Sequence, residues 1–326
     1  MSKYEIDCKE VAEVGGEKYY LRIRGQDVKN PVVLFLHGGC GSPDRAHMLR
    51  FQSPLAEKFT LVAWDQRGSG LAYDKREAAN TVLTRELIVS DAVNVVGWLK
   101  RRFGKDKIII VGHSWGSAIG VWLAQAVPED ICAYVGIGQV VDYVRNEQMS
   151  YVWTLEEAER MGDVKSLETL AEIGYPENGV YAGDNRACQM KQRAVLHKLG
   201  GATYANRRPY WQELLFHDIP IVLGEYGLSG AVKYIKGISY SGSSPMARDN
   251  PDFMNTAKKL DVPVYLTLGR HDFNCVHTLA EEWLERLEAP VKKLIWFENS
   301  AHSPQWEEAE EWNRTFESLF DCGVAK

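Results

Sequence analysis

The feature that most constrains the fold is a series of short apolar runs, each ending in a glycine-containing turn. Three of them are PVVLFLHGG (31–39), FTLVAWDQRGSG (59–70) and KIIIVGHSWG (107–116). Runs that are apolar at successive positions are typical of strands buried on both faces of a sheet. Amphipathic helical segments lie between them, such as 83–103, which ends at Gly104. Strand and helix therefore alternate, which predicts an α/β fold with a mostly parallel, twisted sheet flanked by helices.

This alternation stops between 142 and 251, a stretch rich in Trp, Tyr, Arg and Glu that contains no clear buried strand. We interpret 1–141 and 252–326 as the α/β core and 142–251 as a helical cap inserted into it, of the size of a small domain. Near the end of the insertion, GISYSGSSP (237–245) is rich in Gly and Ser and is interpreted as a flexible connection.

Beyond the insertion the alternation returns. The segments VPVYLTLG (262–269) and KKLIWFEN (292–299) predict two further buried strands. HTLAEEWLERLE (277–288) predicts a helix between them, and the stretch 303–320 predicts one last helix.

Composition excludes several classes of partner. Lys and Arg number 38 against 44 Asp and Glu, a net charge of −6, so no basic face is expected for nucleic acid. No apolar run approaches the ~20 residues that span a bilayer, so we expect no membrane partner. The six cysteines are scattered without a CxxC pair, and MSKYEIDCKE lacks the apolar region of a signal peptide, which predicts free thiols and a cytoplasmic location. No metal-ligand cluster, phosphate loop or dinucleotide motif occurs, so we expect no metal and no cofactor. The oligomeric state stays open.

The motif Gly112-His113-Ser114-Trp115-Gly116 lies between a predicted strand and a predicted helix. In this context G-x-S-x-G forms a sharp turn that holds the serine in a strained conformation with its hydroxyl projecting from the sheet. Side chains at Gly112 and Gly116 would collide with neighbouring backbone. Ser114 is therefore the predicted nucleophile, and the epoxide-opening and dehalogenating chemistries that need an aspartate at this position are disfavoured.

A serine hydroxyl needs a general base, and the base needs an acid to orient it. In this architecture the chain order is Ser, then Asp or Glu, then His, in loops after later strands. Asp272 follows the strand at 262–269 and is the predicted acid, and His302 follows the strand at 292–299 and is the predicted base. His271 and His277 compete with His302 for this role. Three aspartates precede the strand and are interpreted as helix caps or turn residues: Asp249, Asp252 and Asp261.

Hydrolysis through a serine ester also needs two donors for the oxyanion of the tetrahedral intermediate. The backbone N–H of Trp115, directly after the nucleophile, is one predicted donor. The other is expected in the loop HGGCG (37–41), whose glycines let the backbone approach a substrate closely, and we predict that Gly39 supplies it.

The motifs HGGCG, WDQRGSG, GHSWGS, GRHD and AHSPQWEE resemble, in order and approximate spacing, those of α/β-hydrolases of the prolyl iminopeptidase family. That family carries HGGPG, DQRG, G-x-S-W-G-S, an Asp after a strand that ends in Gly-Arg, and a His near the C-terminus. The resemblance covers most of the core and implies an α/β-hydrolase fold with a helical cap. It also implies Ser114 as nucleophile, Asp272 as acid, His302 as base, and Gly39 with Trp115 as the oxyanion pair.

Cys40 stands where the family has Pro, which alters the loop but keeps its backbone donors. The resemblance further implies an aminopeptidase whose substrate is a short peptide or an amino-acyl amide, with Pro as one candidate N-terminal residue. In that family acidic cap residues bind the free amine of the substrate. Glu213 and Glu225 are our candidates, although acidic residues of a cap helix usually form a solvated face.

Two other functions stay open. The cap aromatics could line an apolar pocket for a small ester, lactone or amide, or they could form the core of the cap itself. The fold could also serve a non-catalytic ligand-binding protein, although the intact Ser-Asp-His order favours an enzyme. The aromatics concerned are Trp153, Tyr175, Tyr181, Tyr204, Tyr210, Trp211, Tyr226 and Tyr234.

Overall fold

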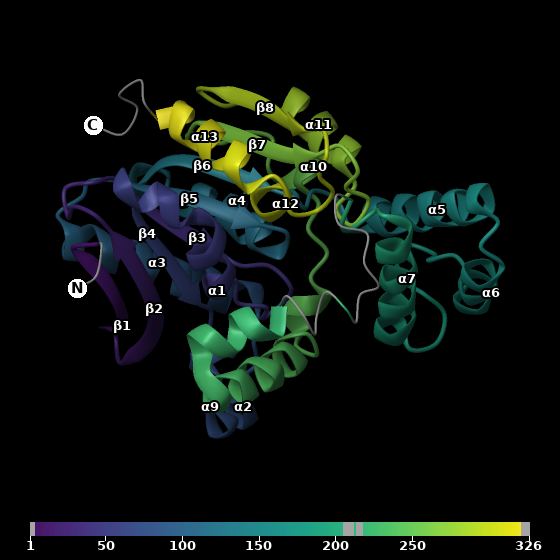
Figure 1. Ribbon diagram of the computed structural model, residues 1–326, viewed down its shortest axis with the longest axis horizontal. Helices are drawn as coiled ribbons and strands as arrows, with labels where there is room; N and C mark the ends of the chain where they lie inside the picture. The colour runs from purple at the N-terminus through teal and green to yellow at the C-terminus, as the bar shows by residue number, and fades with distance from the viewer. Residues whose placement is uncertain (1–3, 205–211, 213–217, 321–326) are drawn as a thin grey trace.

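The computed structural model describes residues 4–204, 212 and 218–320, and Figure 1 shows how they are arranged. Within these residues an eight-stranded sheet has the order β1-β2-β4-β3-β5-β6-β7-β8. β1 and β2 form an antiparallel hairpin, β2 is antiparallel to β4, and all the other neighbours are parallel, as predicted. The strands are β1 (Ile6–Val14), β2 (Glu17–Gly25), β3 (Val32–Leu36), β4 (Thr60–Asp65), β5 (Ile108–His113), β6 (Ile131–Ile137), β7 (Val264–Gly269) and β8 (Lys292–Phe297).

Both faces of the sheet are covered, which explains why β3 is apolar at every position. In β3, Val32, Leu34 and Leu36 join one hydrophobic cluster, whereas Val33 and Phe35 join the other. Each fully buried side chain of this kind stabilises the fold by about 1.5–3 kcal/mol. The first cluster includes residues of α3 (Arg85–Phe103), α4 (Trp115–Ala126) and α11 (His277–Arg286); the second includes residues of η1 (Met48–Gln52), η2 (Ser53–Glu57) and α13 (Ala309–Phe320).

The chain between β6 and β7 is helical where the structure describes it, and its helices form two groups. Figure 1 shows α5, α6 and α7 together beyond the sheet, whereas α9 lies apart from them near α1 and α2. α9 packs against α1 and η3, which follow β3 and β4. The helices of the two inserted groups are α5 (Tyr143–Met161), α6 (Val164–Ile173), α7 (Asn185–Leu199) and α9 (Ile219–Ser241). The helices of the core near α9 are α1 (Arg45–His47), η3 (Gly70–Ala72) and α2 (Lys75–Asn80).

Two of the sequence-based predictions about helices are wrong. The stretch 237–241, interpreted as part of a flexible connection, is the last turn of α9, and Gly237 and Ser241 are buried against the loop after β4. The predicted last helix is broken at Glu308 into α12 (Pro304–Glu307) and α13. Glu308 leaves the helical conformation because its carboxylate accepts hydrogen bonds from Asn299 N–H (3.0 Å) and from the Ser300 hydroxyl (2.6 Å).

Close backbone approach fixes the turn between β5 and α4. A Cβ atom at Gly112 would lie 2.4 Å from the carbonyl oxygen of Gly116, and one at Gly116 would lie 1.9 Å from that of Leu36. Real Cβ atoms do not approach backbone this closely, so glycine is required at both positions, as the sequence predicted. The turn therefore locks β3, β5 and α4 together.

We predict that Gly116→Ala lowers the free energy of unfolding by about 3 kcal/mol or more, because neither backbone segment can move away without breaking sheet hydrogen bonds. The matched control is Gly97→Ala in α3, where the nearest atom to the added Cβ is the end of the Arg101 side chain at 3.5 Å. That control should stabilise the protein by about 0.5–1 kcal/mol. Urea denaturation of both variants tests this, and equal effects of the two substitutions would contradict it.

His37, directly after β3, is fully buried and neutral. Its Nδ1 donates to the Gly38 carbonyl (3.1 Å), and its Nε2 accepts from the N–H of Gln66 (3.2 Å). Burial lowers the pKa of His37 to about 4. A buried imidazole in this position therefore joins the loop after β3 to the loop after β4.

Stability should fall between neutral pH and pH 5 because of His37. The pKa of this side chain is about 6.5 in the unfolded chain and about 4 in the folded protein. In this window the unfolded chain binds more protons, and at pH 5 the loss amounts to about 2 kcal/mol. Denaturation at pH 7.5 and pH 5.0 should show this difference for the wild type and a smaller one for His37→Asn. An identical pH dependence in both proteins would overturn the assignment.

Candidate functional site

Ser114 occupies the strained turn between β5 and α4. Its backbone has φ 53° and ψ −124°, a conformation that non-glycine residues adopt only where the surroundings enforce it. The enforcing contacts are hydrogen bonds from Ser114 N–H to the Ile137 carbonyl (2.9 Å) and from the Ser117 hydroxyl to the Ser114 carbonyl (2.5 Å). The side chain is half-buried at the edge where the parallel strands end.

Asp272 and His302 are joined by a hydrogen bond. His302 Nδ1 donates to Asp272 Oδ2 at 2.9 Å, and Asp272 is fully buried. The other carboxylate oxygen, Oδ1, accepts from the N–H groups of Asn274 and Cys275, both at 2.9 Å. Three donors therefore satisfy the carboxylate, and the bond at Nδ1 fixes the tautomer in which Nε2 of His302 carries a lone pair.

The imidazole of His302 lies at the same strand edge as Ser114. A Cβ atom at Gly138, the residue after Ile137, would lie 2.8 Å from the His302 ring. His113 Nε2 lies 3.1 Å from the His302 carbonyl oxygen, and the two imidazole rings are 4.9 Å apart. Burial and the neighbouring His302 hold the pKa of His113 well below its usual range. Among the described residues no direct hydrogen bond joins the Ser114 hydroxyl to His302.

Cys275 is a buried residue whose thiol senses the Ser114 side chain, and the sequence analysis missed it. Burial raises the pKa of the Cys275 thiol, as does the charge of Asp272, while a hydrogen bond with the Ser114 side chain lowers it in part. Cys275 follows Asp272 by three residues and lies in the same loop. No local pattern distinguishes it from the other free cysteines that the structure describes, which are Cys8, Cys40, Cys132 and Cys188.

The loop after β3 passes directly against the nucleophile. A Cβ atom at Gly38 would lie 2.9 Å from Ser114 Cβ, so the residue before Gly39 touches Ser114. Gly39 itself has φ +84°, and a Cβ there would lie 2.6 Å from the Ser42 hydroxyl. Trp115 is the first residue of α4, so its N–H has no acceptor within the helix. Both predicted oxyanion donors therefore belong to segments that adjoin Ser114.

The two histidines that competed with His302 have other contacts. His271 stacks on Tyr204 with ring centroids 3.4 Å apart. His277 begins α11, and its ring packs edge-on against Phe273 and Trp296. Burial lowers the pKa of His277. Neither imidazole hydrogen bonds to Asp272 among the described contacts, so the structure brings only His302 to that carboxylate.

Glutamates after His302 hold its loop, a role that the sequence analysis did not predict. Glu307 Oε1 accepts the N–H of Ala301 at 2.9 Å, and Glu308 holds Ser300 as described above. The backbone N–H of His302 donates to the Ala202 carbonyl, between α7 and the undescribed stretch that follows Tyr204. The position of the imidazole thus depends on both the core and the inserted segment.

Of the two predicted amine-binding residues, Glu225 is the one that the structure describes. Glu213 lies outside the described residues, as do Tyr210 and Trp211 among the predicted aromatics. The carboxylate of Glu225 contacts Lys9 (3.3 Å), Arg22 (3.6 Å) and Arg45 (3.2 Å), all of them cations of the core. The structure therefore gives Glu225 partners within the chain, in place of the free carboxylate that the prediction required.

A different acidic residue of the inserted helices is buried. Glu147 of α5 is 1% exposed and forms an ion pair with Arg193 of α7. Its second oxygen, Oε2, is buried without a hydrogen-bond partner among the described residues. The charge of Arg193 lowers the pKa of the Cys275 thiol and that of Glu147 raises it. The Glu147–Arg193 pair is therefore within electrostatic range of Cys275, in the loop that carries Asp272.

The described residues contain no group of His, Cys, Asp and Glu side chains that could hold a metal ion. None of their helices combines the length and the apolar character needed to cross a membrane.

Comparisons with known proteins identify the family. A family model described as alpha/beta hydrolase fold matches residues 31–309. Over 312 residues the chain is 33% identical to a probable aminopeptidase, YbaC, of Bacillus subtilis (strain 168), covering 94% of each protein. It is 24% identical over 302 residues to a proline iminopeptidase of Clostridioides difficile (strain 630), covering 91% of this chain and 92% of that one.

Solved structures agree on the fold. A proline iminopeptidase from Mycobacterium smegmatis superposes with a TM-score of 0.64 at 13% identity, covering 96% of this chain and 97% of that one. VinJ gives a TM-score of 0.65 at 17% identity with the same coverage. Identities this low compare architecture alone, and the architecture is the sheet and flanking helices described above. By its family match and its relative at 33% identity, the chain belongs to the alpha/beta hydrolase fold family.

Proposed function

We propose that this alpha/beta hydrolase is a serine hydrolase that works through an acyl-enzyme on Ser114. The observation that carries the proposal is the 2.9 Å hydrogen bond between His302 Nδ1 and buried Asp272, at the edge where Ser114 is held at φ 53°. A strained serine beside an imidazole of fixed tautomer is the arrangement that activates a hydroxyl. The missing Ser114–His302 hydrogen bond does not oppose this, because such bonds often tighten only when substrate binds.

In the proposed reaction, Nε2 of His302 takes the proton of the Ser114 hydroxyl as its oxygen attacks the substrate carbonyl. The backbone N–H groups of Gly39 and Trp115 stabilise the resulting oxyanion. As the tetrahedral intermediate collapses, His302 gives the proton to the leaving amine and the acyl group stays on Ser114. Water, deprotonated by His302, then attacks the ester and regenerates the hydroxyl. Asp272 stabilises the imidazolium throughout.

The substrate we propose is a short peptide or amino-acyl amide with a free N-terminal amine. Relatives named probable aminopeptidase and proline iminopeptidase, which align with over 90% of this chain, support this class. The buried Oε2 of Glu147, which has no hydrogen-bond partner among the described residues, offers an acceptor for the ammonium group. A buried carboxylate oxygen in this state gains most from a charged donor. We therefore assign the amine to Glu147, in place of Glu225.

An esterase, lactonase or amidase that acts on an uncharged acyl group is the second candidate. The observation in its favour is the ion pair with Arg193, which neutralises much of the charge of Glu147. A non-catalytic ligand-binding protein is the remaining alternative. Turnover of p-nitrophenyl acetate beside Pro-, Ala- and Leu-nitroanilides separates the three, because a binding protein would give at most a burst without turnover.

Ser114→Ala should abolish labelling by a fluorophosphonate probe and steady-state turnover, because it removes the hydroxyl that attacks the probe and the substrate. Asp272→Asn should keep the fold but lower kcat about 10³-fold or more, since an amide no longer orients the imidazole in the required tautomer. Full labelling of Ser114→Ala, at a stoichiometry equal to that of the wild type, would contradict the assignment of the nucleophile.

Glu147→Gln should lower kcat/KM for Pro-nitroanilide at least about 10-fold, which is the effect of losing a charged hydrogen bond in a buried site. Turnover of p-nitrophenyl acetate, which has no amine, should change less than about threefold. The control is Glu172→Gln on α6, whose carboxylate pairs with Lys191 at the surface and is 67% exposed. Equal losses on both substrates would exclude an amine-binding role for Glu147.

A further inference from the structure

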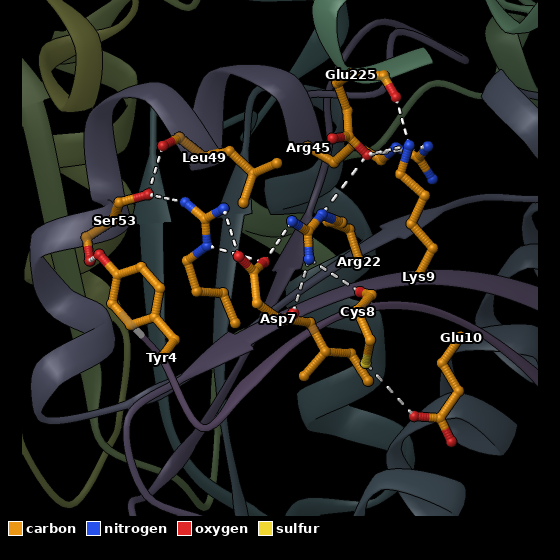
Figure 2. A network of polar contacts seen from close by, with 12 residues as sticks. Tyr4, Asp7, Cys8, Lys9, Glu10, Arg22, Arg45, Leu49, Ser53 and Glu225 are labelled. Atoms are coloured by element: carbon orange, nitrogen blue, oxygen red, sulfur yellow. Dashed lines mark hydrogen bonds and ion pairs between the residues drawn. The ribbon is translucent and has the colours of Figure 1, made fainter. Parts of the chain in front are cut away.

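Glu225 connects helix α9 to the sheet through ion pairs with two buried arginines and the half-exposed Lys9, drawn in Figure 2. Its Oε1 atom lies 3.2 Å from Arg45 Nη2, 3.3 Å from Lys9 Nζ and 3.6 Å from Arg22 Nε. The Arg45 side chain is 1% exposed and that of Glu225 11%. Figure 2 shows the Glu225 carboxylate pointing toward these cations, which come from β1, β2 and α1.

The residue after Glu225 completes the surroundings of Arg45. The Tyr226 ring lies 4.1 Å from the guanidinium carbon of Arg45, and its hydroxyl donates to Asp65 Oδ1 at 2.8 Å. Asp65 is fully buried at the end of β4, and its other oxygen lies 3.2 Å from Arg45 Nη1. Arg45 thus depends on α9 for one of its two carboxylates and for the aromatic face over it. A buried cation that loses such a partner is left uncompensated.

The loop 38–45 starts in contact with Ser114 and ends at Arg45. At the start of this loop Gly38 touches Ser114, and the Gly38 carbonyl accepts the N–H of Ser42 at 3.2 Å in a tight turn. In its middle, a Cβ atom at Gly41 would lie 2.4 Å from Ser241 Cβ at the end of α9. α9 therefore contacts the loop 38–45 at two places, through Ser241 and through the residues around Arg45.

We propose that Glu225 and Arg45 are positioning residues through which α9 holds the loop 38–45, and with it the N–H of Gly39, in the geometry that receives the oxyanion. This inference rests on the proposed serine hydrolase function. It gives α9 a part in transition-state stabilisation, because a displaced oxyanion donor weakens binding of the transition state more than binding of the substrate. If the contacts with α9 are lost, the loop cannot move closer to Ser114 to restore the position of the Gly39 N–H, because Gly38 already touches Ser114.

The first test is the kinetics of Glu225→Gln, which removes the charge and keeps the shape. We expect kcat to fall about 10-fold, a part of the 10²–10³-fold cost of losing an oxyanion donor outright, with KM changed less than twofold. The loss should be equal for Pro-nitroanilide and p-nitrophenyl acetate, and the rate of fluorophosphonate labelling at Ser114 should fall by the same factor. Arg45→Lys, which keeps the charge, should lose less than Arg45→Met. Lys236→Gln, at an exposed position of α9, is the matched control.

The second test follows amide hydrogen exchange over 37–48 and requires no activity. Exchange there should speed up at least about fivefold in Glu225→Gln and stay unchanged in Lys236→Gln, because loss of the ion pairs frees the loop to open. If Glu225→Gln does not fold, Tyr226→Phe replaces it, since this variant removes only the hydroxyl that binds Asp65.

The outcomes separate the explanations. Loss on the anilide alone would make Glu225 a substrate-binding residue and overturn the proposal. A lower melting temperature with unchanged exchange over 37–48 and unchanged labelling would show that the ion pairs stabilise the fold without positioning the loop. That result would also overturn the proposal. If the wild type neither labels nor turns over substrate, the serine hydrolase function fails, and the exchange measurement still decides whether α9 holds the loop.

Discussion

The close approach of backbone segments around Ser114 is the constraint on which the rest of the structure depends. Glycine at 112 and 116 lets β5 turn into α4 within van der Waals distance of the end of β3, and the serine between them takes a conformation that it would not adopt alone. Because all three segments touch, a shift in any of them moves the hydroxyl. Ser114 N–H donates to the end of β6, and the Ser117 hydroxyl donates to the Ser114 carbonyl. These two hydrogen bonds therefore hold the loops around the nucleophile as well as the turn itself.

Parallel strand order then brings distant residues together. β6, β7 and β8 follow β5 in this order across the sheet, and all four strands are parallel. The loops after these strands therefore lie at one end of the sheet. This is why Asp272 and His302 could be predicted from their place after buried strands, without knowledge of any contact between them. The strands, the glycine turn and the helical nature of the inserted chain were predictable for the same reason, because apolar runs and their spacing encode them locally.

Other features could not be predicted, because they depend on contacts between residues far apart in the chain. Nothing near Cys275 in the sequence indicates that the pKa of its thiol depends on Ser114. Nothing near Glu308 indicates that its carboxylate accepts a hydrogen bond from Ser300 at a break between two helices. The Gly and Ser residues of 237–241 favour a flexible segment by composition. They form a helix instead because small side chains allow α9 to approach the loops at Gly41 and Gly68.

Glu147 and Glu225 of the inserted helices show that the role of an acidic residue cannot be predicted until its partners in the structure are known. By sequence Glu147 and Glu225 are equivalent, each an acid within a helix that carries aromatic residues. Burying a carboxylate costs several kcal/mol unless cations and donors compensate it. Glu225 forms ion pairs with three cations of the core, and these ion pairs join α9 to the sheet. Glu147 pairs with Arg193, and its Oε2 has no hydrogen-bond partner in the part of the chain that the structure describes, so a cation bound from outside the chain would compensate it.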